Sequence, residues 1–416
     1  MSYRALVTRP VLVWSAVAVT GRLPVAMAPL ALVFLVREQP GGYSYGAVLA
    51  AAYVLGEIVG APVLGMRMRA ERARPQLVAG LVAGAVGFLG VGLWPGAHPA
   101  VLCALAALAG GGPAAVPGGL RALLTGMVPE TSVTQAMSWE SVLTFGIWAA
   151  APALTTGLAL AVDPALPLLL AGTAMALSAT GLRLLPAGWA TGPQERGAAV
   201  RRALLAAWPV YLMGAGALTL LALAELMLPA LLEQRGIGIG WAGPLLAGFS
   251  AGSAVGAFLY GLRGRWPGRL PAQSVLLTLG VTAGVALVAV LPGAAGIGPA
   301  LAGAGLLMAP AILTRNLMLR QVLPPSALAA GYSVMYAAVG AGYALSGTLA
   351  GGLLKVAAPS TAILYGVTLT VLLTLAGALG ERRVAGRGDG RADRRVDGRA
   401  AGVQPETVAP ERKVRR

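Results

Sequence analysis

Long apolar runs alternate with short polar intervals along most of this chain. Each run holds about 20 or more residues with few charges, which is the length that an α-helix needs to cross the hydrocarbon core of a bilayer. Proline and glycine occur inside the runs, and membrane helices tolerate both because neighbouring helices satisfy the freed backbone groups. The pattern predicts twelve membrane-spanning helices, at residues 10–36, 43–66, 76–95, 99–127, 134–160, 165–186, 203–232, 241–262, 272–292, 296–322, 327–356 and 359–380.

The second half of the chain repeats the first. Residues 49–67, LAAAYVLGEIVGAPVLGMR, align without a gap on residues 245–263, LLAGFSAGSAVGAFLYGLR. A second window aligns the residues around Pro129 with those around Pro324. Two similar apolar halves in one chain are typical of duplicated membrane transporters. The sequence therefore predicts an all-α membrane protein in which the twelve helices form two pseudo-symmetric six-helix bundles.

Changes in hydropathy divide the chain into parts. Residues 1–186 form the predicted N-terminal bundle, and residues 203–380 form the C-terminal bundle. The polar residues 187–202 join the two as a cytoplasmic linker. Residues 381–416 are rich in Arg, Gly and Asp and lack an apolar period, so they are expected to be a disordered basic cytoplasmic tail.

Arginines gather on one side of the predicted membrane helices. If the N-terminus is cytoplasmic, the outer side receives only Arg37, Arg235 and Lys355. Cytoplasmic loops of membrane proteins carry an excess of Lys and Arg, so the pattern predicts that both termini face the cytoplasm. The inner side then receives Arg4, Arg9, Arg67, Arg69, Arg72, Arg74, Arg183, Arg196, Arg201, Arg202, Arg263, Arg265, Arg269, Arg320 and the tail.

The composition agrees with a protein embedded in lipid. Hydrophobic residues make up 57% of the chain and charged residues 11%, whereas a soluble domain carries roughly 25% charged residues. The inner loops and the tail account for the net charge of +16, which indicates contact with anionic lipid rather than with nucleic acid. The bias for Ala, Gly, Arg and Pro favours a bacterial origin, and hence the cytoplasmic (inner) membrane of the cell.

Several kinds of chemistry have no residues to support them. The chain contains one cysteine, Cys103, and one histidine, His98, so neither a disulfide nor a metal cluster is expected. No Gly-Lys-Ser/Thr loop is present that would bind ATP, and no set of nucleophile, base and acid is visible. Residues 110–112, three glycines within an apolar run, predict close helix packing. We therefore expect no cofactor and no enzymatic activity.

Loop motifs carry a family resemblance. The loop after the second run reads GMRMRAERARP from Gly65, and its counterpart in the second half reads GLRGRWPGR from Gly261. Together with the six-plus-six arrangement, and with the segments GRLPVAMAPLALVF and ELMLPALLEQRG, these loops resemble the major facilitator superfamily, especially a broad group of bacterial drug and metabolite efflux transporters. The family usually has an aspartate where this chain has Arg69, and Glu71 is its candidate substitute. The resemblance implies alternating access and a monomer.

The motifs of the drug-exporter branch are kept only in part. The segment LAALAGGGPAA in the fourth run supplies the glycines of one motif without its arginine. The segment APALTTG in the fifth run keeps Pro152 of another motif but replaces its glycine pair. The resemblance to this branch therefore rests on the overall pattern rather than on complete motifs.

Charged side chains fall inside the predicted membrane helices, where each costs about 2.5–3.5 kcal/mol even on insertion scales. Arg22 and Glu57 lie near mid-depth on adjacent helices and are predicted to form an ion pair. That pair is either structural or a switch in which Glu57 takes up a proton and releases Arg22. The candidates for substrate binding or proton coupling are Arg22, Glu57, Arg121, Glu140, Glu225 and Arg315.

The remaining charges have alternative interpretations. Glu225 lies in the outer third of helix seven without a basic residue at its depth. It is a proton site, a contact for a cationic substrate, or a carboxylate facing the water of an outer vestibule. Arg121 and Arg315 lie in the inner third of helices four and ten, and either extend to the inner surface or attract an anionic substrate group. Glu140 is expected to form a structural pair with Arg121.

Aromatic and hydroxyl residues of helices five and eleven are candidates for lining the transport cavity, because the resemblance implies that both helices border it. An aromatic residue in a membrane helix can also serve packing or lie at the lipid interface. The candidates are Trp139, Thr144, Trp148, Tyr332, Tyr336 and Tyr343.

The pattern as a whole predicts a secondary active transporter. We expect it to export a small, fairly apolar organic compound, such as a drug or a secondary metabolite, with protons as the coupling ion and the lipid bilayer as its environment. Protonation of Glu57 or Glu225 would shift the balance between inward-open and outward-open states. Two alternatives stay open: an uptake symporter for a small organic solute, and a sensor on the same scaffold that transports nothing.

Overall fold

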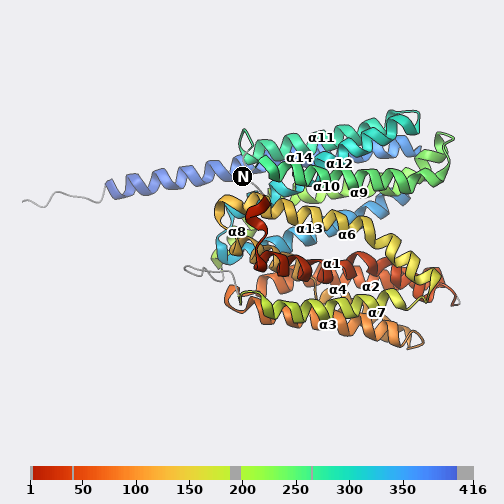
Figure 1. Cartoon of the computed structure of the whole chain (residues 1–416). Helices are drawn as coiled ribbons and strands as arrows, with labels where there is room; N and C mark the ends of the chain where they lie inside the picture. The colour runs from red at the N-terminus through yellow and green to blue at the C-terminus, as the bar shows by residue number, and fades with distance from the viewer. Residues whose placement is uncertain (1–2, 40–41, 188–197, 264–265, 401–416) are drawn as a thin grey trace, which may run out of the picture.

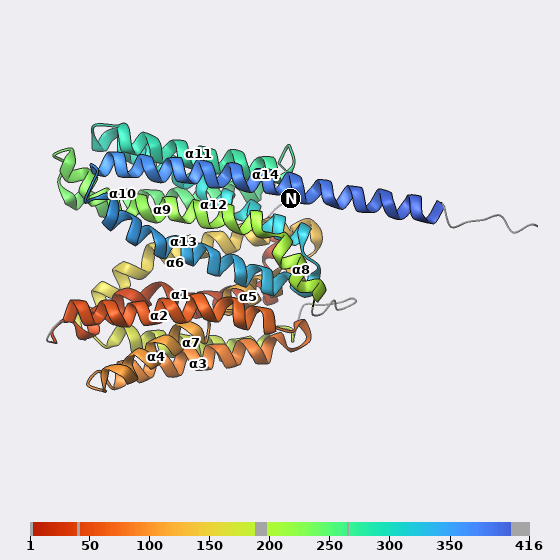
Figure 2. The same cartoon turned by 180° about the vertical axis from the view of Figure 1, so that it is seen from behind.

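The computed structural model shows an elongated helical molecule in two halves (Figures 1 and 2) and describes residues 3–39, 42–187, 198–263 and 266–400. Short 3-10 helices occur among these residues at η1 (Tyr3–Leu6), η2 (Ala70–Arg72), η3 (Glu130–Ser132), η4 (Leu182–Leu184), η5 (Ile239–Trp241) and η6 (Pro325–Ala327). The α-helices are α1 (Arg9–Val36), α2 (Gly42–Arg67), α3 (Ala73–Leu93), α4 (Pro99–Gly111), α5 (Val116–Met127), α6 (Val133–Ala161), α7 (Leu166–Gly181), α8 (Ala198–Ala206), α9 (Trp208–Gln234), α10 (Ala242–Arg263), α11 (Leu270–Val290), α12 (Ala294–Val322), α13 (Leu328–Leu353) and α14 (Pro359–Ala400).

Within the described residues, 12 segments are long and apolar enough to cross a membrane, which confirms the predicted number. The fourth predicted helix is interrupted, because α4 ends at Gly111 and α5 begins at Val116. Pro113 lies in this break, and a proline has no N–H to continue a helical ladder. The preceding glycines pack closely, as predicted: a Cβ on Gly110 would lie 2.1 Å from the carbonyl oxygen of Tyr53 on α2.

The two halves use the same packing plan. In the N-terminal half α2 packs on α4, α3 on α7, and α1 on α7; in the C-terminal half the corresponding pairs are α10 with α12, α11 with α14, and α9 with α14. One buried apolar cluster belongs to residues 6–185 and another mainly to residues 217–363. A third cluster joins the halves, with Met137 from α6, Leu319 from α12 and Tyr332 from α13.

A repeated hydrogen-bond pattern holds the two loops that carry the family-like motifs. In the N-terminal half the Gln76 side chain accepts from the Arg69 backbone N–H at 2.7 Å and donates to the Arg67 carbonyl oxygen at 3.0 Å. In the C-terminal half the Gln273 amide donates to the carbonyl oxygens of residues 266–268 at 3.1–3.2 Å. Each glutamine comes from the first turns of the helix that follows its loop, so both turns are fixed by the same device.

The two ends of the molecule differ in the segments that lie there. Residues 3–8, α8 and the projecting part of α14 lie at one end (Figures 1 and 2), which we call the terminal face. The opposite end, which contains the loops at 94–98, 162–165 and 354–358, is called the distal face. The helices run between these faces, as expected for segments that cross a bilayer.

The predicted boundaries of the linker and tail differ from the structure. Helix α8 begins at Ala198, inside the predicted linker, and residues 188–197 lie outside the described residues. Helix α14 continues to Ala400, whereas the sequence analysis expected disorder from residue 381. Arginine is the commonest residue between 381 and 400 and has high helix propensity, which favours continuation of the last membrane helix through this segment. Residues 401–416 of the expected tail lie outside the described residues.

Candidate functional site

The two halves touch most closely toward the terminal face. A Cβ on Gly65 of α2 would lie 2.4 Å from the Cβ of Ser333 on α13, and a Cβ on Gly261 of α10 would lie 2.6 Å from the Cβ of Ser138 on α6. A Cβ on Gly118 of α5 would also lie 2.5 Å from the Ser333 hydroxyl oxygen. Glycine is needed at these positions because any side chain would push the helices of the two halves apart. The halves are therefore closed at this end.

The interface is less crowded toward the distal face. In the middle and distal parts of α6 and α13, an added Cβ would meet no atom within 4 Å at Gly146, Gly157, Gly340, Gly347 and Gly351. Side chains on the same segments are exposed, among them Trp148 of α6 at 48% and Tyr343 of α13 at 43%. The close glycine contacts between the halves thus lie toward the terminal face, and the distal segments of the same helices have room.

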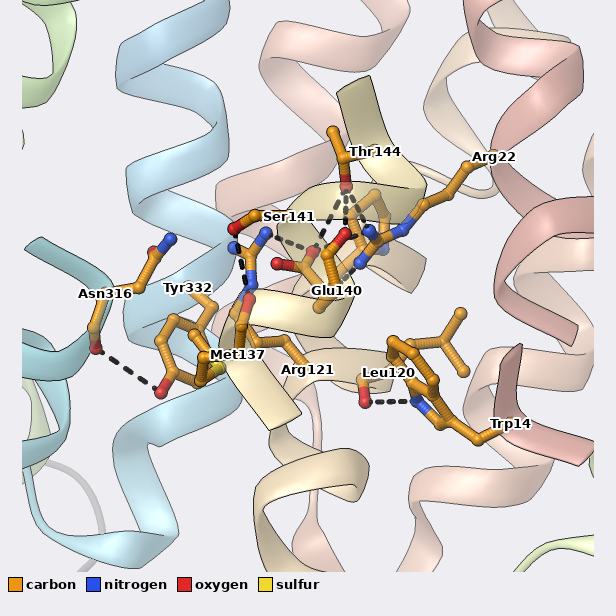
Figure 3. A network of polar contacts seen from close by, with 11 residues as sticks. Trp14, Arg22, Leu120, Arg121, Met137, Glu140, Ser141, Thr144, Asn316 and Tyr332 are labelled. Carbon is orange, nitrogen blue, oxygen red and sulfur yellow. Dashed lines mark hydrogen bonds and ion pairs between the residues drawn. The ribbon is translucent and has the colours of Figure 1, made fainter. Parts of the chain in front are cut away.

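A network of charged groups lies where α1, α5 and α6 meet (Figure 3). Arg22 donates from Nη1 to Glu140 Oε1 at 2.5 Å and to Thr144 Oγ1 at 2.8 Å. Arg121 donates from Nη2 to the same Glu140 oxygen at 2.6 Å. The Glu140 side chain is 2% exposed, so this carboxylate holds two guanidinium groups away from water. The predicted pairing of Glu140 with Arg121 is confirmed.

The network reaches the other half through an aromatic ring. The Arg121 guanidinium lies 5.4 Å from the centroid of the Tyr332 ring on α13, a distance at which the ring face attracts a cation. The Tyr332 hydroxyl in turn donates to the Asn316 carbonyl oxygen of α12 at 3.5 Å. Two arginines and one glutamate leave this network with one formal positive charge at the boundary between the halves.

The predicted ion pair between Arg22 and Glu57 is wrong. Arg22 pairs with Glu140 instead, while Glu57 accepts a hydrogen bond at 2.5 Å from the Tyr336 hydroxyl. Helix α1 packs on α2 and on α6, and its rotation points Arg22 toward α6. Depth along a helix can be counted from the sequence, but the direction in which a side chain points follows from packing.

Two carboxylates are held by tyrosine hydroxyls of one helix. Tyr336 of α13 donates to Glu57 of α2 at 2.5 Å, so this contact joins the two halves. Tyr343, two turns further along α13, donates to Glu225 of α9 at 3.4 Å, within the C-terminal half. Neither carboxylate forms an ion pair with a basic side chain among the residues that the structure describes. All four residues were candidates from the sequence, but their pairing was not predicted.

Arg315 does not extend to the terminal surface, although this was one of the two alternatives predicted for it. It is 1% exposed and donates from Nη2 to the Thr278 hydroxyl of α11. Its Nε and Nη1 atoms have no hydrogen-bond partner among the described residues. Arg121 likewise ends at Glu140 rather than at the surface. Thr278 could not be found from the sequence, because a threonine in an apolar helix gives no signal that an arginine lies beside it.

The cavity-lining candidates have different surroundings. Trp139 donates from Nε1 to the Ser15 hydroxyl at 2.9 Å, Thr144 belongs to the charged network, and Tyr332 is buried. Trp148 and Tyr343 are exposed on the distal segments. A cavity of about 680 Å³ lies between the halves near the terminal face, and none of the six candidates lines it. Their role in a transport pathway stays a prediction.

The fold is similar to those of solved transporters. The human organic anion transporter MFSD10 is 15% identical, with 91% of this chain and 100% of that chain covered and a TM-score of 0.67. The fucose transporter of the major facilitator superfamily, solved in the outward conformation, is 13% identical, with 92% and 99% covered and a TM-score of 0.69. A bacterial homologue of the iron transporter ferroportin in the outward-facing state is 16% identical, with 90% and 98% covered and a TM-score of 0.66.

These similarities concern the fold. No family model matches the sequence, and no curated protein matches it. The chain is a multi-pass membrane protein whose described residues form twelve apolar helices of membrane-spanning length, and it has the fold of major facilitator superfamily transporters, as expected from the resemblance.

Proposed function

We propose that this protein is a proton-coupled secondary transporter that works by alternating access. The fold supports transport, because the similar solved structures are transporters that each align over at least 90% of this chain. The observation that carries the proton coupling is the hydrogen bond between Glu57 and Tyr336, because it joins the two halves through a carboxylate without a basic partner among the described residues. One similar structure is of an E. coli fucose:proton symporter, which agrees with proton coupling on this fold.

Protonation of Glu57 changes the contact between the halves. A hydrogen bond to a charged carboxylate is roughly twice as strong as one between neutral groups. When Glu57 takes up a proton, the Tyr336 hydroxyl loses a charged acceptor and the bond between α2 and α13 weakens. The halves then separate more easily at this point, so proton binding shifts the balance between the two open states. Glu225 and Tyr343 form a second site of the same kind within one half.

The finer features of the proposal rest on the sequence. The excess of arginine at the terminal face favours an orientation in which that face lies in the cytoplasm, and the composition favours a bacterial cell. The resemblance to efflux transporters favours export of a small, fairly apolar organic compound by a monomer. The exposed side chains of Trp148 and Tyr343 are suited to contact such a compound from the distal side. In this scheme the structure represents the outward-facing state, since the halves meet toward the terminal face.

Reconstituted protein tests the proposal. Proteoliposomes with an imposed pH gradient are screened against a panel of labelled organic compounds, first with the unchanged chain and then with Glu57→Gln. We expect the variant to lose transport driven by the gradient, because its amide cannot gain or lose a proton, while exchange of labelled for unlabelled compound without a gradient continues. Tyr336→Phe is the matched variant that removes the donor and keeps the carboxylate.

The outcomes separate the alternatives. Gradient-driven transport by Glu57→Gln at the level of the unchanged chain would remove this residue from the coupling. Accumulation in the direction of proton entry would identify an uptake symporter instead of an exporter. Binding of a compound without any flux would identify a sensor.

A further inference from the structure

The cavity of about 680 Å³ near the terminal face is built from both halves of the protein. Its N-terminal wall comes from α5, η3 and α6, with Thr125, Val133 and Thr134 among the lining residues. Its C-terminal wall comes from α10 to α13 and the loop before α11, with Trp266, Leu317 and Arg320. Pockets of about 300–1,000 Å³ hold drug-sized molecules. The volume therefore fits a small organic ligand rather than a single ion or water.

A cavity with walls from two bodies depends on how those bodies are arranged. The halves meet closely beside it, through Gly65 with Ser333 and Gly261 with Ser138. If the terminal ends of the halves separate, the two walls move apart and the cavity is lost. A ligand that fills it therefore binds one arrangement better than the other, and a ligand shifts a conformational equilibrium only by such a difference in affinity.

The aromatic wall of the cavity is held in place. The rings of Tyr260 and Trp266 stack with centroids 5.2 Å apart and planes 15° from parallel. The Tyr260 hydroxyl donates to Gln273 Oε1 at 2.7 Å, and the Gln273 amide donates to the backbone at residues 266–268. Leucine side chains such as Leu317 and Leu328 line the same cavity as these rings. A flat apolar molecule can pack against these aromatic and leucine side chains.

The charged part of the lining points to an acid. Arg320 from the C-terminal half pairs with Glu130 from the N-terminal half, and both line the cavity. The Glu130 side chain is 77% exposed and that of Arg320 is 22% exposed. Water therefore competes strongly for the Glu130 carboxylate, and an exposed ion pair contributes little. A carboxylate on a ligand inside the cavity can replace Glu130 as the acceptor for Arg320.

We propose that this cavity is a binding site for a drug-sized aromatic carboxylic acid, which bridges the two halves and holds them together at the terminal face. The ring system of the ligand lies against the aromatic and leucine wall, and its carboxylate accepts from Arg320. Bound ligand opposes the separation of the halves and so slows transport. This last effect rests on the alternating access proposed above, whereas binding itself does not.

Two substitutions of the same ion pair test the binding. The full chain in lipid nanodiscs is titrated with 2-naphthoic acid by calorimetry, as the unchanged protein and as Glu130→Gln and Arg320→Gln. We expect Glu130→Gln to bind more tightly, because Arg320 loses its competing partner. Arg320→Gln should bind about tenfold or more weakly, as expected for loss of a charged hydrogen bond. Both variants remove the ion pair between Glu130 and Arg320. If that pair served only to hold the halves together, both substitutions would change the affinity in the same direction.

Further controls separate charge from shape. The neutral 2-naphthalenemethanol should bind the unchanged protein at least tenfold more weakly than the acid does. The alcohol should also bind Arg320→Gln and the unchanged protein with the same affinity. Thr134→Trp fills the cavity, leaves the ion pair in place, and should abolish binding of the acid. No measurable binding of 2-naphthoic acid to the unchanged protein and to Glu130→Gln, or equal affinities for the acid and the alcohol, would overturn the proposal.

Distances between the distal loops test the conformational part. Cys103→Ser removes the single native cysteine, and spin labels are placed at Val162→Cys and Val356→Cys, positions that are 70% and 81% exposed on the loops of the two halves. We expect 2-naphthoic acid to enrich the longer distances, which correspond to closure at the terminal face. Binding with an unchanged distance distribution would refute the bridging role. These readouts need no proton gradient, so they are independent of the assay for proton coupling.

Discussion

Arg121, with a side chain 11% exposed, and Arg315, which is 1% exposed, lie on corresponding helices of the two halves, yet their surroundings differ. The alignment that places Pro129 on Pro324 places Arg121 on Asn316 and puts Arg315 one residue earlier. One residue is about 100° around an α-helix. Arg121 therefore faces α6 and α13, where it pairs with Glu140, whereas Arg315 faces α11 and donates to Thr278.

This difference shows that the two halves share their helix packing but not the chemistry of their side chains. The repeat keeps the helices and their partners, since α2 packs on α4 as α10 packs on α12. It does not keep the charges: Glu140 has two guanidinium partners in the N-terminal half, while two nitrogens of Arg315 have no hydrogen-bond partner among the described residues. The ionic network comes from one half, and the aromatic contacts at the boundary, Tyr332 and Tyr336, come from the other.

Neutralising Glu140, the carboxylate that Arg22 and Arg121 share, should cause the largest loss of stability. In Glu140→Gln, the Arg22 and Arg121 guanidinium groups stay near one another, largely shielded from water, without a negative charge between them. Breaking a buried ion pair by neutralising one partner costs about 3–5 kcal/mol. We expect the free energy of unfolding, measured by denaturant titration in detergent micelles, to fall by that amount. Glu225→Gln, which breaks no ion pair among the described residues, is the control and should change the free energy of unfolding much less; equal losses would contradict the network.

Matched substitutions of the two arginines should then move stability in different directions. Arg121→Met removes a charged hydrogen bond and a cation–π contact, and should cost about 2–3 kcal/mol. Arg315→Met replaces a guanidinium whose Nε and Nη1 have no hydrogen-bond partner among the described residues with an apolar chain of similar length. Because burying an incompletely paired charge costs free energy, we expect this variant to be as stable as the unchanged chain or more stable. Thermal unfolding midpoints of both variants in one detergent check this. A larger loss for Arg315→Met would mean that the surroundings of Arg315 stabilise its charge.

The aromatic contact of Arg121 should show the smallest effect. Tyr332→Phe removes only the hydroxyl, which donates over 3.5 Å, and keeps the ring under the guanidinium. The change in unfolding free energy should stay below about 0.5 kcal/mol. Tyr332→Leu also removes the ring and should cost about 1 kcal/mol more. Equal unfolding free energies for the two variants would show that the cation–π contact contributes nothing.

The sequence predicted the fold well and the site unevenly. Apolar length and the internal repeat led to the twelve helices, and the spacing of Arg121 and Glu140 across a short loop led to their pairing. The pairing of Arg22 with Glu57 failed because both residues were placed by depth alone. Arg22 is 118 positions from its partner Glu140 along the chain, and Tyr336 is 279 from Glu57. Such contacts depend on helix rotations and on the docking of the two halves.

The amino-acid sequence alone determined that the chain crosses a membrane many times, because apolar length and scarce charge leave no other stable environment for it. It also determined which few residues carry charge within the helices. Only the tertiary structure decided which of those charges meet. The reason is physical: hydropathy acts on each helix separately, whereas an ion pair needs two side chains from different helices to point at each other within about 4 Å. That geometry depends on the close helix packing at the glycines. It also depends on the one-residue shift between Arg121 and Arg315 in the alignment of the two halves.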